Sequence, residues 1–385
     1  MQFQKLLAAV IFIVSSLLCV PTVCCAYDYA TILWKGTRQE LTGRTLVEAQ
    51  DGGIVFESRD RKIWAAEPNN VLSLKRNGDA AFEPFDRREI TAALLADLPA
   101  GFQIFDTDHY IIAHNTSLAY AQWCGALYER LHKAFTNFWQ HRGLTLHETP
   151  PLVAVVFQDR QSFEAYGKEE LGDAVKAVIG FYSLHTNRIT TYDLTGVDQA
   201  RGNSRALGTP RKINQALLAN PEAERTVATV IHEATHQLVF NSGMQQRFAD
   251  IPVWLSEGLA IYFETPDLGR SRGWATIGAK NQVRLGQMKR YTQNRPAHSL
   301  KSLIVDNARF RDTRTAETAY AEAWSLCYFL RKQSPKQFDQ YMRLLQKKPT
   351  AVEDSPHQRL DEFEATFGSL DEIEPRFMKM ISNLR

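Results

Sequence analysis

Two histidines four residues apart, with a glutamate directly after the first, have the clearest chemical potential in this sequence. They are His232, Glu233 and His236, in the segment TVIHEATHQLVF. On a helix, residues four apart share a face, so the two imidazoles can reach one point in space. Zinc accepts neutral imidazoles at about 2.0–2.1 Å, and a neighbouring glutamate can take a proton from a metal-bound water. The pattern also occurs by chance on amphipathic helices, so a zinc site needs a third ligand.

A third ligand is available in the segment WLSEGLAIYFE (254–264), which follows the second histidine closely. Its Glu257 lies about one turn into a helix that we expect to begin at Pro252. The short connection lets this helix return against the first one. A carboxylate among so many apolar residues needs a partner if it is buried, and a zinc ion supplies one. The predicted site therefore has Zn²⁺ ligands His232, His236 and Glu257 and the general base Glu233.

Together the two segments resemble the active-site signature of the gluzincin (peptidase MA-like) zinc metallopeptidases, especially the aminopeptidase-N-like branch. In that branch a tryptophan-leucine-x-glutamate-glycine segment carries the third ligand, as WLSEG does here. The resemblance covers about residues 178–333 and implies a peptide or protein substrate. It also implies that Tyr320, in TAYAEAWSLCYFL (318–330), stabilises the oxyanion of the tetrahedral intermediate. Strand 178–184 would correspond to the strand along which the substrate lies.

The sequence departs from this branch at one motif. It contains no glycine-x-methionine-glutamate-asparagine segment, which recognises the free N-terminus of an aminopeptidase substrate. We therefore expect an endopeptidase in preference to an aminopeptidase. One alternative is a catalytically inactive, exported zinc-binding protein that uses a peptidase scaffold for binding. Another is zinc-dependent hydrolysis of an amide or ester in a cell-wall component.

Three further residues are weaker candidates for the site. Glu264 lies two helical turns beyond Glu257 and can orient a ligating histidine, although an acid at a helix end is more often solvated. His185 and His298 can donate to an oxyanion, but a histidine in a loop or strand usually has neither this role nor a metal.

The N-terminus has the order of a secretory signal peptide over residues 1–26. Lys5 precedes an apolar run from Leu6 to Val20, and small residues follow up to Ala26. The run of about 15 residues is short of the roughly 20 that span a bilayer, so an uncleaved anchor is the weaker interpretation. We expect a secreted or periplasmic protein with no membrane span after signal removal. Its two remaining cysteines, Cys124 and Cys327, can form one disulfide, but we favour separate buried thiols.

The predicted fold class is α+β. Residues 27–100 contain five short strand patterns, expected to form a small antiparallel barrel or sandwich, and then a linker with one short helix. The role of this domain is open: an adaptor, a pro-segment or a lid. Residues 101–385 contain strands, expected as a mixed sheet, and then helices, one of them over 221–241. Lys and Arg (45) nearly balance Asp and Glu (43), which argues against a nucleic-acid partner. The oligomeric state is not predicted.

Overall fold

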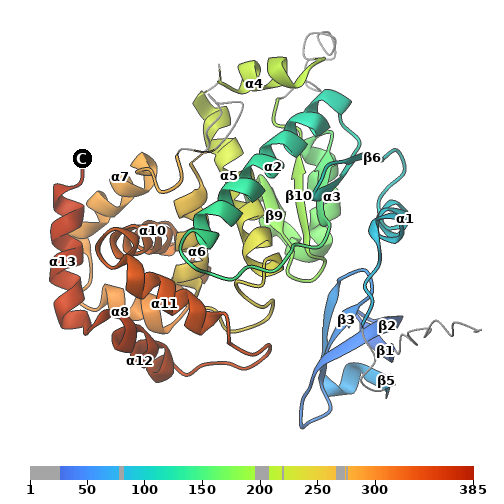
Figure 1. Ribbon diagram of the computed structural model, residues 1–385, viewed down its shortest axis with the longest axis horizontal. Helices are drawn as coiled ribbons and strands as arrows, with labels where there is room; N and C mark the ends of the chain where they lie inside the picture. The colour runs from blue at the N-terminus through green and yellow to red at the C-terminus, as the bar shows by residue number, and fades with distance from the viewer. Residues whose placement is uncertain (1–26, 78–81, 196–207, 219–220, 266–273, 275) are drawn as a thin grey trace, which may run out of the picture.

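The computed structural model describes residues 27–77, 82–195, 208–218, 221–265, 274 and 276–385. The predicted signal peptide, 1–26, lies outside this part of the chain. Over the described residues, no helix has both the length and the apolar character needed to cross a membrane. The structure confirms the α+β class: an antiparallel sheet comes first, then a mixed sheet and many helices (Figure 1).

The N-terminal part is one antiparallel sheet of five strands in the order β4-β3-β2-β1-β5. The five predicted strands are present, but they form a single sheet in place of the expected barrel or sandwich. The long strand β2 pairs with both β1 and β3, and a register shift between Thr45 and Val47 lets it bend. Ile32, Phe56 and Trp64 fill the small core. The strands are β1 (Asp28–Trp34), β2 (Thr37–Glu48), β3 (Ile54–Ser58), β4 (Ile63–Ala66) and β5 (Val71–Lys75).

The second sheet is mixed, as predicted, with the order β6-β7-β8-β10-β9. Strands β7, β8 and β10 run parallel, and the two edge strands pair antiparallel. Alternate side chains point to opposite faces, so Ile112 and Ala154 pack with α2 and α5 while Ile111 and Val153 pack with α1 and α3. The strands are β6 (Gln103–Asp106), β7 (Tyr110–His114), β8 (Leu152–Phe157), β9 (Gly180–Tyr182) and β10 (Arg188–Tyr192), and the helices are α1 (Arg87–Asp97), α2 (Leu118–Gln140), α3 (Arg160–Leu171) and α5 (Pro221–Asn241).

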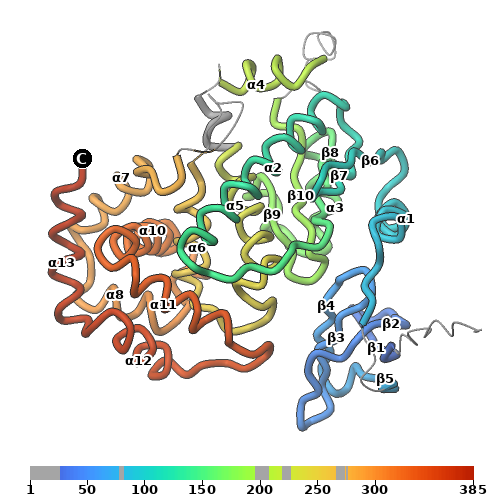
Figure 2. Tube along the Cα trace, in the orientation of Figure 1, coloured from blue at the N-terminus to red at the C-terminus, as the bar shows by residue number. Residues whose placement is uncertain are grey.

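Helix α1, which the sequence places in a linker, is part of the second sheet's core. Asp86 caps its N-terminus and Glu89 closes the capping box. Ile90 and Leu94 are buried against the sheet. The chain passes from the N-terminal sheet through α1 to β6 (Figure 2).

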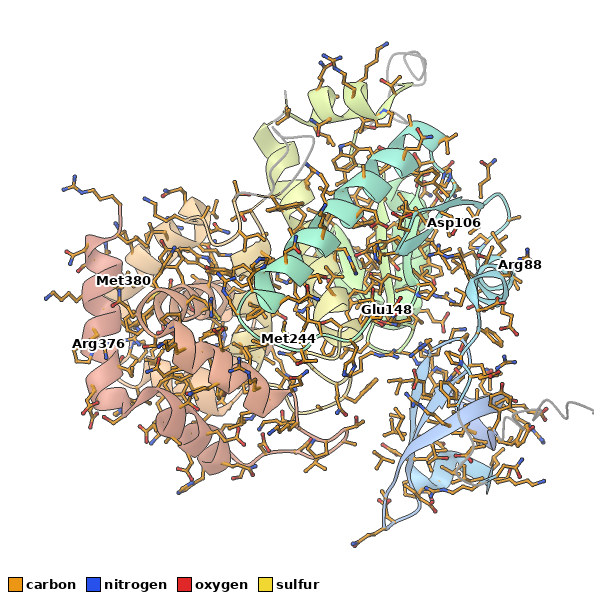
Figure 3. The ribbon with its side chains drawn as sticks, viewed as in Figure 1. Arg88, Asp106, Glu148, Met244, Arg376 and Met380 are labelled. Atoms are coloured by element: carbon orange, nitrogen blue, oxygen red, sulfur yellow. The ribbon has the colours of Figure 1, made fainter. Side chains whose placement is uncertain are left out.

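The rest of the chain is helical, and α6 is its most buried helix. Trp254, Leu255 and Leu259 are at most 1% exposed, because α6 lies between α5 and α10. Side chains fill the space between the helices, with Met244 near the middle of the molecule (Figure 3). Helix α4 begins at the end of a segment, residues 197–212, whose composition and lack of periodicity predict a loop; residues 197–207 of that segment lie outside the described part of the chain. The α-helices of this part of the described chain are α4 (Pro210–Leu218), α6 (Val253–Phe263), α7 (Gln282–Tyr291), α8 (Ser299–Val305), α9 (Ala308–Arg311), α10 (Ala316–Gln333), α11 (Pro335–Leu345), α12 (Pro356–Phe367) and α13 (Leu370–Asn383).

The two cysteines of the described chain are free and buried, as the favoured interpretation predicts. Cys124 lies in α2 and Cys327 in α10. Burial raises the pKa of both thiols, so they pack as small apolar side chains.

Candidate metal centre

Helix α5 presents the two predicted histidine ligands side by side. Val230, Ile231 and Ala234 are buried in the core, which leaves His232 and His236 on a partly open edge of the helix. Their side chains are only 13% and 12% exposed. The two Nε2 atoms lie 3.1 Å apart, so both imidazoles point at one place.

Helix α6 brings Glu257 to the same place. Its Oε2 lies 3.1 Å from Nε2 of His232, and its Oε1 lies 3.6 Å from Nε2 of His236. Tetrahedral zinc with bonds of about 2.0–2.1 Å needs ligand atoms about 3.3 Å apart. The 3.1 Å separations between the two Nε2 atoms and between Nε2 of His232 and Oε2 of Glu257 are close to that requirement. The donor set of two nitrogens and one carboxylate oxygen is one that zinc accepts.

The far nitrogens of both imidazoles also face suitable partners. Nδ1 of His232 lies 3.6 Å from Oε2 of Glu264, a buried oxygen that has no hydrogen bond. Nδ1 of His236 lies 3.4 Å from Oγ of Ser256. An imidazole that binds a metal through Nε2 carries its proton on Nδ1, where such acceptors orient the ring. Glu264 therefore lies where the sequence hypothesis requires, and Ser256 is an addition from the structure.

His232 and Glu257 stabilise each other's charged forms. Burial opposes ionisation of His232 and Glu257, but their mutual contact outweighs it. The pKa of His232 is raised well above its usual value, because Glu257 and Glu264 stabilise the imidazolium. The pKa of Glu257 is far below its usual range, because His236 and His232 stabilise the carboxylate. A metal cation bound here would replace the proton of the His232 imidazolium as the positive charge that stabilises the Glu257 carboxylate.

Glu233 lies beside the ligands and faces the edge of the second sheet. Its Oε2 accepts a 2.8 Å hydrogen bond from the backbone N–H of Tyr182 in β9. Burial raises the pKa of Glu233, and the neighbouring histidines only partly oppose this effect. The carboxylate is thus a partly buried, oriented group next to the candidate metal ligands.

Tyr320 comes to the site because α6 and α10 pack unusually closely. Gly258 makes this possible: a Cβ at this position would lie 2.5 Å from the carbonyl oxygen of Ala323. The Tyr320 ring meets Phe310 edge to face at 5.3 Å, and Arg284 lies over it. The negative charge of Glu257, then burial and Glu233, raise the pKa of the Tyr320 phenol, so the hydroxyl is neutral and keeps its proton.

The other two candidate histidines have different surroundings. His185 stacks on Trp34 of the N-terminal sheet, and His298 is exposed directly before α8. Sequence reasoning missed two polar residues that follow the base on α5, Gln237 and Asn241. The sequence does contain a pattern that could have indicated them. Glu233, Gln237 and Asn241 are spaced four residues apart, and most of the residues between them are apolar.

Comparison with known proteins adds a family without an assigned activity. Residues 226–351 match the family described as "Protein of unknown function (DUF1570)". The matched region contains the three candidate ligands, Glu233 and Tyr320. A search of curated proteins found no match to the chain.

Proposed function

We propose that this protein is an exported zinc-dependent metallopeptidase that hydrolyses internal peptide bonds. The observation that carries the proposal is the convergence of three donor atoms from α5 and α6, all within 4.8 Å of one another. Export is proposed from the signal-like residues 1–26, and internal cleavage from the missing amine-recognition motif.

The surrounding residues suit a hydrolytic reaction. A zinc ion held by the three ligands would supply Lewis acidity toward a carbonyl and lower the pKa of a water molecule. Glu233 would accept the proton of the attacking water and pass it to the leaving amine. The neutral phenol of Tyr320 would donate a hydrogen bond to the oxyanion. The two groups come from different elements, α5 and α10, and both interact electrostatically with Glu257.

Strand β9 supports a peptide substrate. It is an edge strand of the second sheet, and its Tyr182 amide contacts Glu233. An extended peptide that adds to such an edge gains backbone hydrogen bonds whatever its side chains are. The peptide bond to be cleaved would then lie beside the base.

The proposal is tested with the purified chain, by metal analysis and by digestion of an unfolded protein and a peptide library. We expect one equivalent of zinc and internal cuts, read by mass spectrometry, that stop when a chelator is added. Glu233→Gln should keep the zinc and lose hydrolysis. Cleavage by Glu233→Gln at the wild-type rate would refute the mechanism. One equivalent of zinc with no cleavage of any peptide would instead favour the inactive zinc-binding protein.

A further inference from the structure

The turn between β9 and β10 is bound by the N-terminal sheet through His185. The backbone N–H of Ile63 donates to the His185 carbonyl oxygen at 2.8 Å, and the His185 ring Nδ1 lies 2.7 Å from the Ile63 carbonyl oxygen. The ring stacks on Trp34 at 4.8 Å and meets Trp64 edge to face at 4.6 Å. The His185 ring thus packs against two indoles, Trp34 of β1 and Trp64 of β4, and is hydrogen-bonded to Ile63 of β4.

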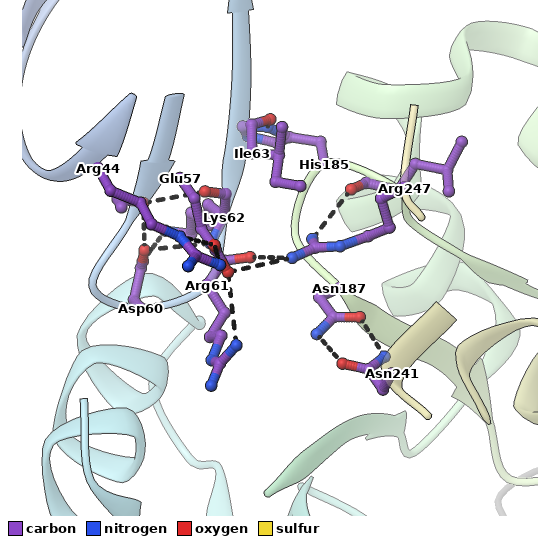
Figure 4. Close-up of polar contacts among 12 residues, drawn as sticks. Arg44, Glu57, Asp60, Arg61, Lys62, Ile63, His185, Asn187, Asn241 and Arg247 are labelled. Atoms are coloured by element: carbon purple, nitrogen blue, oxygen red, sulfur yellow. Dashed lines mark hydrogen bonds and ion pairs between the residues drawn. The ribbon is translucent and has the colours of Figure 1, made fainter. Parts of the chain in front are cut away.

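Arg247 fastens the same turn from a second direction. It follows α5 and donates to the carbonyl oxygens of Leu184 at 3.2 Å and of Arg61 at 2.9 Å (Figure 4). Its guanidinium also lies 3.7 Å from Glu57, a carboxylate only 4% exposed that Arg44 and Arg61 neutralise as well. These contacts join the N-terminal sheet, the turn and the end of α5.

On its inner side the hairpin is held by the helix that carries the proposed base. Gln237 donates to the Asn187 carbonyl oxygen at 2.9 Å. Asn241 and Asn187 exchange two amide hydrogen bonds of 2.7 and 2.8 Å (Figure 4), and the Tyr182 hydroxyl donates to Asn187 Oδ1 at 2.7 Å. With Glu233, the two α5 residues form a row at intervals of four residues, and each member of the row contacts the hairpin.

We propose that the N-terminal sheet is a positioning element: through His185 it holds the β9–β10 turn, which keeps the Tyr182 amide against Glu233. This inference rests on the proposed function, because the position of this carboxylate matters to a rate only if it is the base. Strand β9 has three residues and pairs with β10 alone, so its own ladder is too short to fix its position. The contacts at the turn supply the missing constraint, and a base displaced by about 1 Å can lose two orders of magnitude in rate.

The test compares the wild type with His185→Ala and His185→Asn in the full chain. His185→Ala removes the stacked ring and the hydrogen bond to Ile63, so kcat should fall about tenfold or more while KM stays within about twofold. Zinc content should not change, since no ligand is touched. His185→Asn should recover part of kcat, because its amide N–H can replace the ring N–H.

Lys35→Ala is the matched control. Lys35 joins the same sheet to α3 by exposed contacts with Glu169, at 2.9 Å to the carbonyl oxygen and 3.3 Å to the carboxylate. Its charge acts on His185 from a distance, but its hydrogen bonds and ion pair in the described part of the chain go to Glu169. The kcat of Lys35→Ala should equal that of the wild type. A kcat loss in Lys35→Ala equal to that in His185→Ala would overturn the proposal, because any loosening of the sheet would then suffice.

Hydrogen exchange separates this inference from the proposed function, since it needs no substrate. In His185→Ala the amides of residues 180–182 should exchange at least about tenfold faster, while those of α10 keep their protection. Wild-type protein without peptidase activity would refute the proposed function but leave this readout valid. Unchanged exchange in β9, or a change in KM alone, would overturn the positioning role.

Discussion

The backbone N–H of Tyr182 donates a 2.8 Å hydrogen bond to Oε2 of Glu233, the residue that directly follows one candidate zinc ligand. This bond joins the edge of the second sheet to the helix that carries both histidines. It orients one oxygen of the carboxylate. The local order of the site therefore depends on the sheet as well as on α5 and α6.

Loss of the Glu264 carboxylate should weaken zinc binding. Glu264→Gln keeps the size of the side chain but removes the charge that faces Nδ1 of His232. We expect affinity to fall by about 10- to 100-fold, because such partners fix the ring and raise its basicity. Competition with a chromogenic chelator measures the effect. Glu317→Gln, at an exposed position in α10, is the control and should bind zinc like the wild type; equal affinities in all three proteins would exclude the role of Glu264.

Loss of the Tyr320 hydroxyl should lower kcat and spare KM. Tyr320→Phe keeps the edge-to-face contact with Phe310 but removes the proposed oxyanion donor. We expect kcat to fall by about 100-fold, as for the loss of one oxyanion donor. Tyr328→Phe, two turns further along α10, should have wild-type kinetics. Steady-state cleavage of a quenched-fluorescence peptide gives kcat and KM for each variant. A raised KM with an unchanged kcat in Tyr320→Phe would contradict the assigned role.

A methyl group at Gly258 should destabilise the protein. The added Cβ would lie 2.5 Å from the Ala323 carbonyl oxygen and 2.6 Å from Sγ of Cys327, so α6 and α10 must separate. Overpacking of this kind costs about 1–3 kcal/mol, more than the helix propensity that alanine adds. Gly286→Ala in α7 meets its nearest atom at 3.7 Å and should stabilise by up to about 1 kcal/mol. Urea unfolding of both variants tests the contrast, and a stabilised Gly258→Ala would show that the helices can yield.

The contribution of Asp97 to stability should disappear in acid. Asp97 accepts from Lys62 of the N-terminal region at 2.7 Å and from Arg188 of β10 at 2.8 Å. Burial would raise its pKa, but these two cations outweigh burial and lower it below 3.8. A lowered folded-state pKa stabilises the fold above the unfolded-state value of about 3.9, and this stabilisation is lost as pH falls through the folded-state pKa.

Asp97→Asn should therefore be less stable than the wild type at pH 7, and the difference should shrink below about pH 4. Thermal unfolding of the two proteins at pH 7 and pH 3 measures it. A difference that grows on acidification would mean that the carboxylate is not held by the two cations.

The sequence alone determined the elements that carry the candidate site. The helix expected over 221–241 is present as α5, because the signals at its ends act locally: proline suits the first turn, and Gly243 adopts φ +71° after the last one. The helical period then required His232 and His236 to share a face. Glu257 could be added because the connection between α5 and α6 is short.

The surroundings of these elements depend on tertiary packing, which the sequence pattern does not contain. The N-terminal strands form one open sheet, and α1 joins the core of the second sheet, because strand pairing and helix packing depend on surfaces far apart in sequence. The partners of the hairpin come from equally distant segments: Ile63 lies 122 residues before His185, and Asn241 lies 54 residues after Asn187. The hydrophobic periodicity of a segment indicates which of its side chains are buried, but it does not indicate which other segment they pack against. The roles of the N-terminal sheet and of Gln237 and Asn241 follow from such long-range contacts, so they became visible only in three dimensions.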